Sequence, residues 1–231
     1  MSGHPDDIKM IRDKETIKKD IVDQLYWDHR VDASDVKVDV DDDKVTLYGT
    51  VPSYFARNAA YIDAYAIYGV TKVVNNLKVQ YPPVLKVPSD SDIESNIRNL
   101  LLWNESVDST NINVSVKAGN ITLKGTVDAY WKKLTAETVA GRASGVKDIK
   151  NELAVVPTDN IVDKAIAKDI VNAIDRHYSL DPEDIDVKVS SGKVTLSGTV
   201  ENWYDYRSAM DIVDFTTGVI DINDQLVITP E

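Results

Sequence analysis

A chain of 231 residues with 43% hydrophobic and 28% charged side chains has the composition of a globular protein with room for several small domains. It contains no cysteine, which excludes disulfides, thiolate metal sites and cysteine nucleophiles. The net charge of -12 lies mainly in residues 158–231, where 15 acidic and 6 basic side chains would repel a nucleic-acid backbone. We therefore expect no nucleic-acid partner.

The first 13 residues are polar and charged and lack the apolar centre of a signal peptide. No stretch of the chain approaches the roughly 18 consecutive apolar residues of a membrane-spanning helix. We therefore expect a cytoplasmic protein for the sequence as given. The alternative is a periplasmic protein whose leader has been removed.

The chain begins its regular pattern with an amphipathic helix. From Thr16 to about residue 27, apolar side chains recur at helical spacing. Residues 36–40 then alternate apolar and polar, as in a half-buried strand, and residues 44–51 return as the second strand of a hairpin. Asp43 stands in the turn where the later copies have glycine, and we expect it to adopt the left-handed conformation.

A second helix and a third strand complete the pattern. Pro52 and the residues after it read as a helix start, and Gly69 stands where a C-terminal glycine cap belongs. Residues 70–79 read as a strand. The order is therefore α-β-β-α-β. One sheet with both helices on a single face would bury both apolar stripes.

The same order recurs twice. The second hairpin strand reads KVTLYGTV from Lys44, NITLKGTV from Asn120 and KVTLSGTV from Lys193. Two sets of glycines keep the same intervals of 76 and 73 residues: Gly49, Gly125 and Gly198, and Gly69, Gly145 and Gly218. We assign them structural roles, since a strand glycine permits close approach of another backbone. Two markers in one register predict an internal repeat.

The predicted fold class is α+β, with three tandem two-layer α-β-β-α-β units. Each unit is expected to hold a three-stranded mixed sheet with two helices on one face. The expected boundaries are a flexible leader at 1–13, units at 14–82, 90–156 and 160–229, a proline-rich linker at 83–89 and a short linker at 157–159. Because the linkers are short or stiffened by proline, we expect a semi-rigid array.

These motifs resemble those of the BON domain, named for bacterial OsmY and nodulation proteins. The family's later strand motif is similar to GVTKVVNNL from Gly69, GVKDIKNEL from Gly145 and GVIDINDQL from Gly218. The third copy departs from it with Asp224 in place of asparagine. The stretch before the hairpin also resembles the family in the first two copies, from Trp27 and Trp103, whereas the third has Arg176 at the tryptophan position.

The resemblance implies a bacterial, non-enzymatic module that associates with phospholipid or membrane surfaces and is linked to osmotic or envelope stress. It implies no catalytic residues and no cofactor. Some family members sit beside peptidoglycan-binding domains, and one such pairing is associated with potassium binding. Nothing in the residues themselves suggests otherwise, because no nucleophile or acid/base pair recurs in the three copies.

A pair of aromatic residues follows each Gly-Thr-Val motif, five and six residues after the glycine. Neighbouring residues on a helix point about 100° apart, so one of each pair could be buried while the other faces outward. Exposed aromatic rings at a helix start, with two lysines after the second pair, would suit a lipid headgroup interface. The alternative is that the rings cover a small core or pack against the next unit. The candidate contact residues are Tyr54, Phe55, Tyr130, Trp131, Lys132, Lys133, Trp203 and Tyr204.

Other polar or aromatic features are given structural interpretations. Trp27 and Trp103, near the ends of the first helices, are expected in a core or between units. The acidic turn at 41–43 lacks the spaced ligands of a calcium loop, and the three histidines show no metal spacing. We therefore expect no metal site.

Three functions remain open at this point. The first is a binding module for a membrane surface or a hydrophobic ligand. In this case we expect the second unit to contact lipid, because its acidic and basic side chains balance and it has no net charge. The second is a soluble stress-related scaffold whose apolar patches contact other proteins or a second copy of the chain. The third is a cation sensor that would compact when cations bind. The acidic third unit disfavours anionic lipid.

Overall fold

The computed structural model describes residues 13–82, 86–158 and 161–229, and these hold six helices and nine strands in three units of identical order. The predicted leader at 1–13 lies almost wholly outside the described residues. Unit 1 consists of α1 (Lys14–Trp27), β1 (Val36–Asp41), β2 (Lys44–Val51), α2 (Tyr54–Tyr65) and β3 (Lys72–Val79).

Units 2 and 3 repeat this order. Unit 2 consists of α3 (Asp90–Leu102), β4 (Ile112–Lys117), β5 (Asn120–Val127), α4 (Tyr130–Ala140) and β6 (Asp148–Val155). Unit 3 consists of α5 (Asp163–Asp175), β7 (Ile185–Ser190), β8 (Lys193–Val200), α6 (Trp203–Asp214) and β9 (Asp221–Ile228). The three α-β-β-α-β units predicted from the sequence are confirmed.

Each unit holds one mixed sheet of three strands. The hairpin partner β1 runs antiparallel to β2, with Val36 opposite Gly49, and β3 runs parallel to β2, with Lys72 opposite Lys44. The second helix is the crossover between the two parallel strands. Units 2 and 3 have the same pairing and register. The predicted α+β class with mixed sheets is thus confirmed.

The first helix of each unit inserts a stripe of three side chains into the core. These residues are spaced four apart, so they lie on one face of the helix. They are almost completely buried: Ile17, Ile21 and Leu25 in α1, Ile93, Ile97 and Leu101 in α3, and Ile166, Ile170 and Ile174 in α5. Each stripe packs on the inward side chains of its own sheet.

Gly125 shows why the repeated strand motif needs glycine. Its φ is +126°, and a Cβ atom built there would lie 1.8 Å from the carbonyl oxygen of Asn111. No larger residue fits such an approach without a backbone shift. A Cβ atom built at Gly49 or at Gly198 would lie similarly close to a backbone carbonyl oxygen. These close approaches explain a glycine at each of the three positions.

Two local predictions for unit 1 are wrong. The left-handed residue of the β1–β2 turn is Asp42, with φ +54°, whereas Asp43 is not in that conformation. Helix α2 ends at Tyr65 and is capped by Ala66, so Gly69 belongs to the following turn and is not the cap. Gly69 still has a positive φ of +92°, which explains a glycine there.

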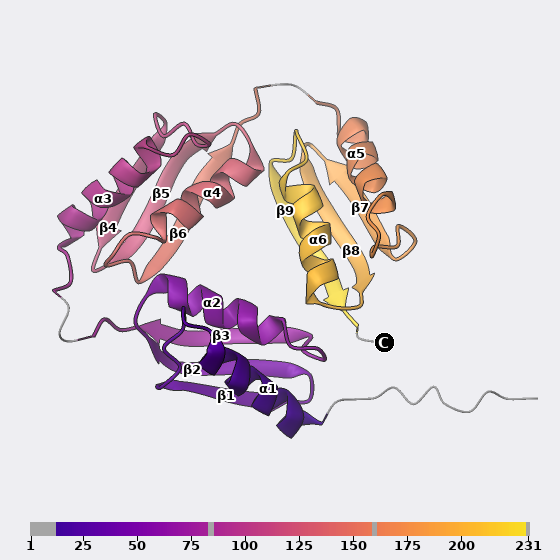
Figure 1. Ribbon diagram of the computed structural model, residues 1–231. Helices are drawn as coiled ribbons and strands as arrows, with labels where there is room; N and C mark the ends of the chain where they lie inside the picture. Colours follow the sequence, from indigo (N-terminus) through magenta and orange to yellow (C-terminus); the bar gives the residue numbers. More distant parts are fainter. Residues whose placement is uncertain (1–12, 83–85, 159–160, 230–231) are drawn as a thin grey trace, which may run out of the picture.

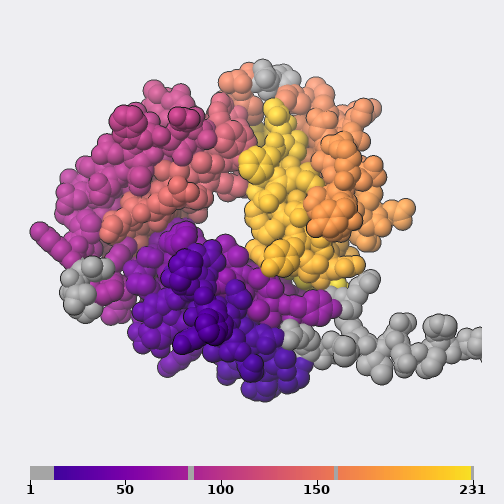
Figure 2. Space-filling model, in the orientation of Figure 1, coloured from indigo at the N-terminus to yellow at the C-terminus, as the bar shows by residue number. Residues whose placement is uncertain are grey.

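The three units form a ring around an open centre. The second helices α2, α4 and α6 surround this opening (Figure 1), and the space-filling view shows it as a hole between the three units (Figure 2). The helices follow one another head to tail, since the start of each lies at the end of another. Such an order places positive helix N-termini beside negative C-termini, a favourable arrangement of helix dipoles.

Candidate binding surfaces

The first members of the three predicted aromatic pairs lie at the contacts that close the ring. Tyr54, the first residue of α2, is only 6% exposed and belongs to the core cluster of unit 2. Its hydroxyl donates to a carboxylate oxygen of Glu137 at 3.3 Å. A Cβ on Gly141, the residue that caps α4, would lie 2.9 Å from the Tyr54 ring. The ring therefore occupies the space that a side chain at position 141 would need.

Tyr130 and Trp203 repeat this role at the other two contacts. Tyr130, the first residue of α4, packs against the core of unit 3, and burial raises its pKa to about 12. Trp203, the first residue of α6, stacks on Tyr65, the last residue of α2, with ring centroids 4.3 Å apart. Each unit thus packs the aromatic residue at the same position, the start of its second helix, against another unit. A contact of this heterologous kind closes into a ring when its rotation allows.

Polar contacts strengthen the junction between units 1 and 2. Arg57 on α2 pairs with Asp148 on β6 at 2.8 Å. The Tyr81 hydroxyl donates to the carbonyl oxygen of Val146 at 2.9 Å and accepts from the amide of Gly145 at 3.0 Å. This tyrosine lies just before the proline-rich linker, so it fixes the chain as it leaves unit 1.

The second members of the aromatic pairs are more accessible. Phe55 is 51% exposed and Tyr204 is 67% exposed. Trp131 is half-buried and stacks on Phe215 of unit 3 at 6.2 Å. One ring is buried and its neighbour exposed only in the first pair, because Tyr130, Trp131 and Trp203 are all half-buried. Whether these rings contact lipid remains a prediction.

The two lysines that follow the second pair already have partners. Lys132 pairs with Asp128 at 2.7 Å, and its ammonium group lies 5.5 Å from the centre of the Trp131 ring. The Lys133 ammonium lies 6.0 Å from the centre of the Tyr130 ring. Both cations are therefore engaged within unit 2, and a lipid phosphate would have to compete with these contacts.

The prediction that Trp27 and Trp103 lie in a core or between units is wrong. Trp27 is 80% exposed and Trp103 is 83% exposed. Each stands two positions beyond the last buried residue of its helix, and two helical steps turn a side chain about 200° away from that stripe. This spacing was visible in the sequence and could have identified both residues as exposed.

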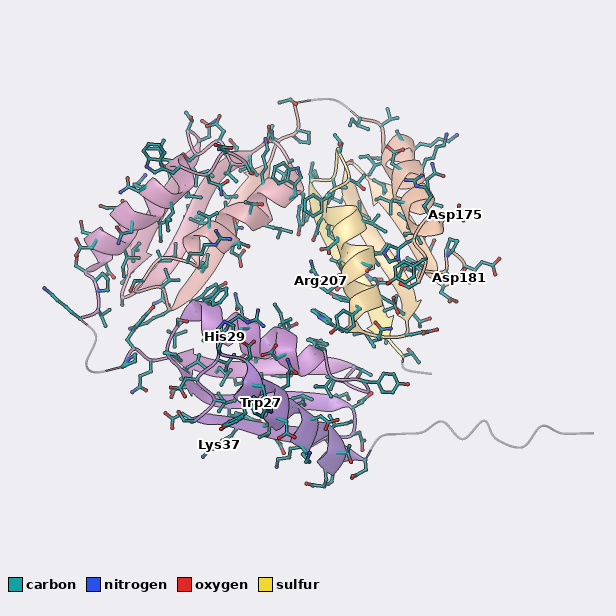
Figure 3. All side chains as sticks on the ribbon, viewed as in Figure 1. Trp27, His29, Lys37, Asp175, Asp181 and Arg207 are labelled. Atoms are coloured by element: carbon teal, nitrogen blue, oxygen red, sulfur yellow. The ribbon has the colours of Figure 1, made fainter. Side chains whose placement is uncertain are left out.

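These tryptophans belong to a repeated set of apolar side chains at the ends of the first helices. We call this set the helix tips. It consists of Tyr26 and Trp27, the last residues of α1, Leu102 and Trp103 at the end of α3, and Tyr178 shortly after α5, each at least 69% exposed. Figure 3 marks Trp27 on α1. Each unit therefore has at least one large exposed apolar side chain at or just after the end of its first helix.

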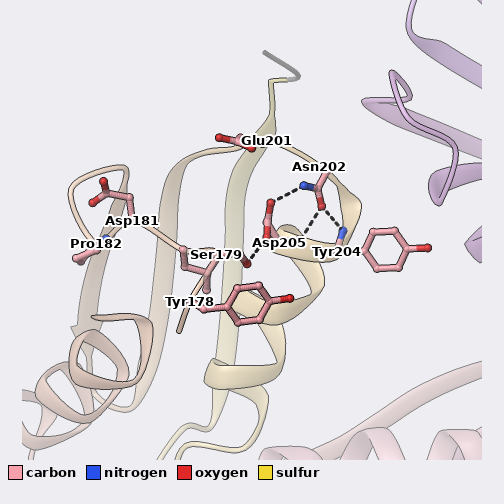
Figure 4. Close-up of a pocket in the computed structure, with 9 residues that line it drawn as sticks. Tyr178, Ser179, Asp181, Pro182, Glu201, Asn202, Tyr204 and Asp205 are labelled. Atoms are coloured by element: carbon pink, nitrogen blue, oxygen red, sulfur yellow. Dashed lines mark hydrogen bonds between the residues drawn. The ribbon is translucent and has the colours of Figure 1, made fainter. Parts of the chain in front are cut away.

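An open pocket of about 780 Å³ lies between the end of α5 and the start of α6 (Figure 4). Asp205 forms its floor, is 6% exposed, and accepts hydrogen bonds from the Ser179 hydroxyl and the Asn202 amide. Tyr178 and Tyr204 also line the pocket. The sequence-based reasoning found Tyr204 but not Asp205, because a lone aspartate on a helix is normally a solvated residue.

Two buried carboxyl groups have raised pKa values. Burial raises the pKa of Asp63 to about 6, and the neighbouring Asp28 carboxylate adds to the effect. Arg30 hydrogen-bonds Asp28 and holds the pKa of that carboxyl far below its usual range. Burial also raises the pKa of Asp214 to about 6. Asp214 is the last residue of α6, and Arg207, which points from α6 toward the open centre (Figure 3), lies 4.0 Å from it.

The described parts of the chain hold neither a cluster of metal-ligating side chains nor a membrane-spanning helix. In residues 13–82, 86–158 and 161–229, no cluster of three or more histidine, cysteine, aspartate or glutamate side chains is placed to hold a metal ion. None of the helices described there is long and apolar enough to cross a bilayer.

Comparison with known proteins identifies similar sequences. The BON domain family model matches residues 13–81, 89–157 and 162–230. Osmotically-inducible protein Y of Escherichia coli (strain K12) is 33% identical over 130 residues, which are 54% of this chain and 65% of that protein. An uncharacterized protein in the gshII 5' region of Anaplasma centrale is 31% identical over 116 residues, covering 48% of this chain and 76% of that one. The chain thus spans just under two thirds of the length of the E. coli relative.

A solved structure of CdsD, a structural protein of the Type III secretion system of Chlamydia trachomatis, aligns over 92% of both chains. The sequence identity is 14% and the TM-score is 0.27. That score is too low to relate the arrangement of units in the two proteins.

Proposed function

Since the chain belongs to the BON domain family, we propose that it is a non-enzymatic binding protein that associates with phospholipid surfaces through the helix tips. The observation that supports this proposal is the exposure of the tips. Trp27, Trp103 and Tyr178 are 80%, 83% and 97% exposed at the ends of equivalent helices. Exposed aromatic rings at three related places offer apolar surface that a membrane or a protein partner can cover.

The chemistry of the tips suits the boundary between a bilayer and water. Tryptophan and tyrosine are enriched at this boundary because their rings are amphipathic. Three tips on one chain combine weak single contacts into a stronger association where more than one of them reaches the same surface. With a net charge of -12 the protein would be repelled by anionic lipid. We therefore expect it to prefer zwitterionic vesicles.

Liposome co-sedimentation tests this proposal. The variant Trp27→Ala/Trp103→Ala removes two tips, and Tyr48→Ala/Phe55→Ala removes two aromatic rings that are 43% and 51% exposed elsewhere on unit 1. If each tryptophan buries about 100 Å² of apolar surface in the bilayer, its loss removes about 2.5 kcal/mol of binding free energy. The tip variant, which lacks two tryptophans, should then bind zwitterionic vesicles at least about a thousandfold more weakly than the control variant.

The aromatic pairs themselves are poor targets for this assay. Tyr130 packs at a contact between units, so Tyr130→Ala would disturb the ring as well as any lipid contact.

Equal binding by the tip variant and its control would contradict the proposal. Absence of binding by the wild-type protein would favour the alternative, a stress-related scaffold that contacts other proteins without lipid.

A further inference from the structure

A small cavity lies at the seam where unit 3 meets unit 1. Its volume is about 210 Å³, and it is bounded by the end of α2 and the start of α6. Tyr65, Ala66 and Ile67 line it from unit 1, and Trp203 and Ile228 line it from unit 3. The walls are thus mainly apolar. Cavities between domains with such walls are typical places for small ligands.

The seam cavity adjoins the open pocket of unit 3. Glu201, Asn202 and Tyr204 line both hollows, so the two lie directly beside each other. The open pocket adds the carboxyl groups of Asp181 and Asp205 to that of Glu201. An apolar hollow beside an acidic one selects a ligand with an apolar part and a cationic part.

The equivalent place in unit 2 shows what this pocket lacks. By the 73-residue interval of the repeat, Glu201 corresponds to Asp128, and Asp205 corresponds to Lys132. Lys132 pairs with Asp128 at 2.7 Å, so unit 2 carries its own cation. In unit 3 the position of Lys132 is occupied by Asp205, so the pocket has this carboxylate in addition to those of Glu201 and Asp181. Asp205 is held by Ser179 and Asn202, and no lysine or arginine among the described residues lines the pocket beside the carboxylates of Glu201 and Asp181.

Two tyrosines complete the site for a cation. Tyr178 is 97% exposed and Tyr204 is 67% exposed, and both line the open pocket (Figure 4). Aromatic faces together with carboxylates bind organic ammonium groups, because the ring quadrupole and the negative charge attract the cation without requiring the close coordination of a metal. The third unit as a whole has 15 acidic and 6 basic residues.

We propose that the seam cavity and the open pocket together bind one single-chain amphiphile, with an alkyl tail between units 1 and 3 and an ammonium head at Glu201 and Asp181. The cavity volume of about 210 Å³ would hold about seven methylene groups if each takes roughly the volume of a water molecule. Trp27 and Trp103 line neither hollow, whereas Tyr178 belongs both to this site and to the helix tips, so the variants that test the site leave Tyr178 in place.

Isothermal titration calorimetry with two probes of equal tail tests the proposal. Octyltrimethylammonium carries the cationic head, and octanoate carries an anionic one. We expect the ammonium probe to bind at least about tenfold more tightly than octanoate. Glu201→Gln should weaken binding of the ammonium probe about fivefold without weakening octanoate. Glu183→Gln, an exposed carboxylate of the same unit outside both hollows, should change neither.

The tail is tested by filling the cavity. Ala66 has a right-handed helical conformation that leucine also adopts, and Ala66→Leu should weaken both probes at least about tenfold. Equal affinity for the two probes, or unchanged binding in Ala66→Leu, would overturn the proposal. The variant Trp27→Ala/Trp103→Ala should keep its affinity for the ammonium probe even if it loses vesicle binding. Loss of probe binding in that variant would also overturn the proposal.

Discussion

Substitution of Trp203 by alanine should open the ring at the seam between units 3 and 1. No linker joins these two units, so their contact depends on side chains alone. Trp203 stacks on Tyr65 at 4.3 Å and meets Tyr61 edge-on at 6.3 Å, both across the seam. The other two contacts of the ring have a covalent linker as well.

The size of the effect follows from the buried area and the stacking. Trp203 is half-buried, so it removes about 100 Å² from water, which is worth about 2.5 kcal/mol. Stacking across the seam adds about 1 kcal/mol. Together these terms favour the closed ring by about 3.5 kcal/mol, or a factor of about 300. Trp203→Ala should therefore populate open forms that the wild-type chain does not.

Fluorescence transfer between units 1 and 3 measures this opening. The chain has no cysteine, so Lys37→Cys and Lys188→Cys, both at exposed positions, provide unique labelling sites. Trp203→Ala should lower the transfer efficiency and broaden its distribution. The matched control is Trp27→Ala, which removes the same side chain from an 80% exposed position. If the two variants gave the same transfer efficiency, the seam would not depend on Trp203 and the reasoning would be refuted.

Two further predictions concern stability. Gly125→Ala should destabilise unit 2 by about 3 kcal/mol or more in urea denaturation. The reason is that its Cβ would lie 1.8 Å from a carbonyl oxygen, at a backbone φ of +126°. The control variant Gly141→Ala, at an ordinary helical φ, should have a smaller effect. Asp214→Asn should stabilise the protein at pH 7. Burial raises the pKa of Asp214 to about 6, so the folded state holds this proton more tightly than the unfolded chain does. Stability contributed by the protonated group is complete below about pH 4 and is lost as pH rises through 6. Thermal melts across this range should show a gain of about 1 to 2 kcal/mol at pH 7, after allowance for solvent screening, that disappears at pH 4. A gain that did not depend on pH would contradict this account.

Local patterns were sufficient for the units themselves. Alternating residues such as those of β1 identify a strand, and stripes such as Ile17, Ile21 and Leu25 identify a helix face, because each pattern reflects the geometry of its own segment. The repeated glycines added the register. Helical spacing also accounts for the exposed positions of Trp27 and Trp103, whereas their aromatic character alone favours a core or a contact between units.

Local patterns could not decide what covers each apolar face. The local sequence around an aromatic residue at the start of α2 does not differ between a residue that contacts lipid, one that packs in its own core and one that packs on another unit. Tyr54 bonds Glu137, 83 residues away in the sequence, and the pocket floor joins Ser179 to Asp205, 26 residues away.

The sequence by itself determined the three units, their sheets and the need for glycine in the hairpin strands, because each of these depends on neighbouring residues. Only the tertiary structure decided that Tyr54, Tyr130 and Trp203 close a ring, and that a cavity with an acidic neighbour lies at the seam. The physical reason is that such contacts depend on how folded units meet, and the side chains that meet there are far apart along the chain.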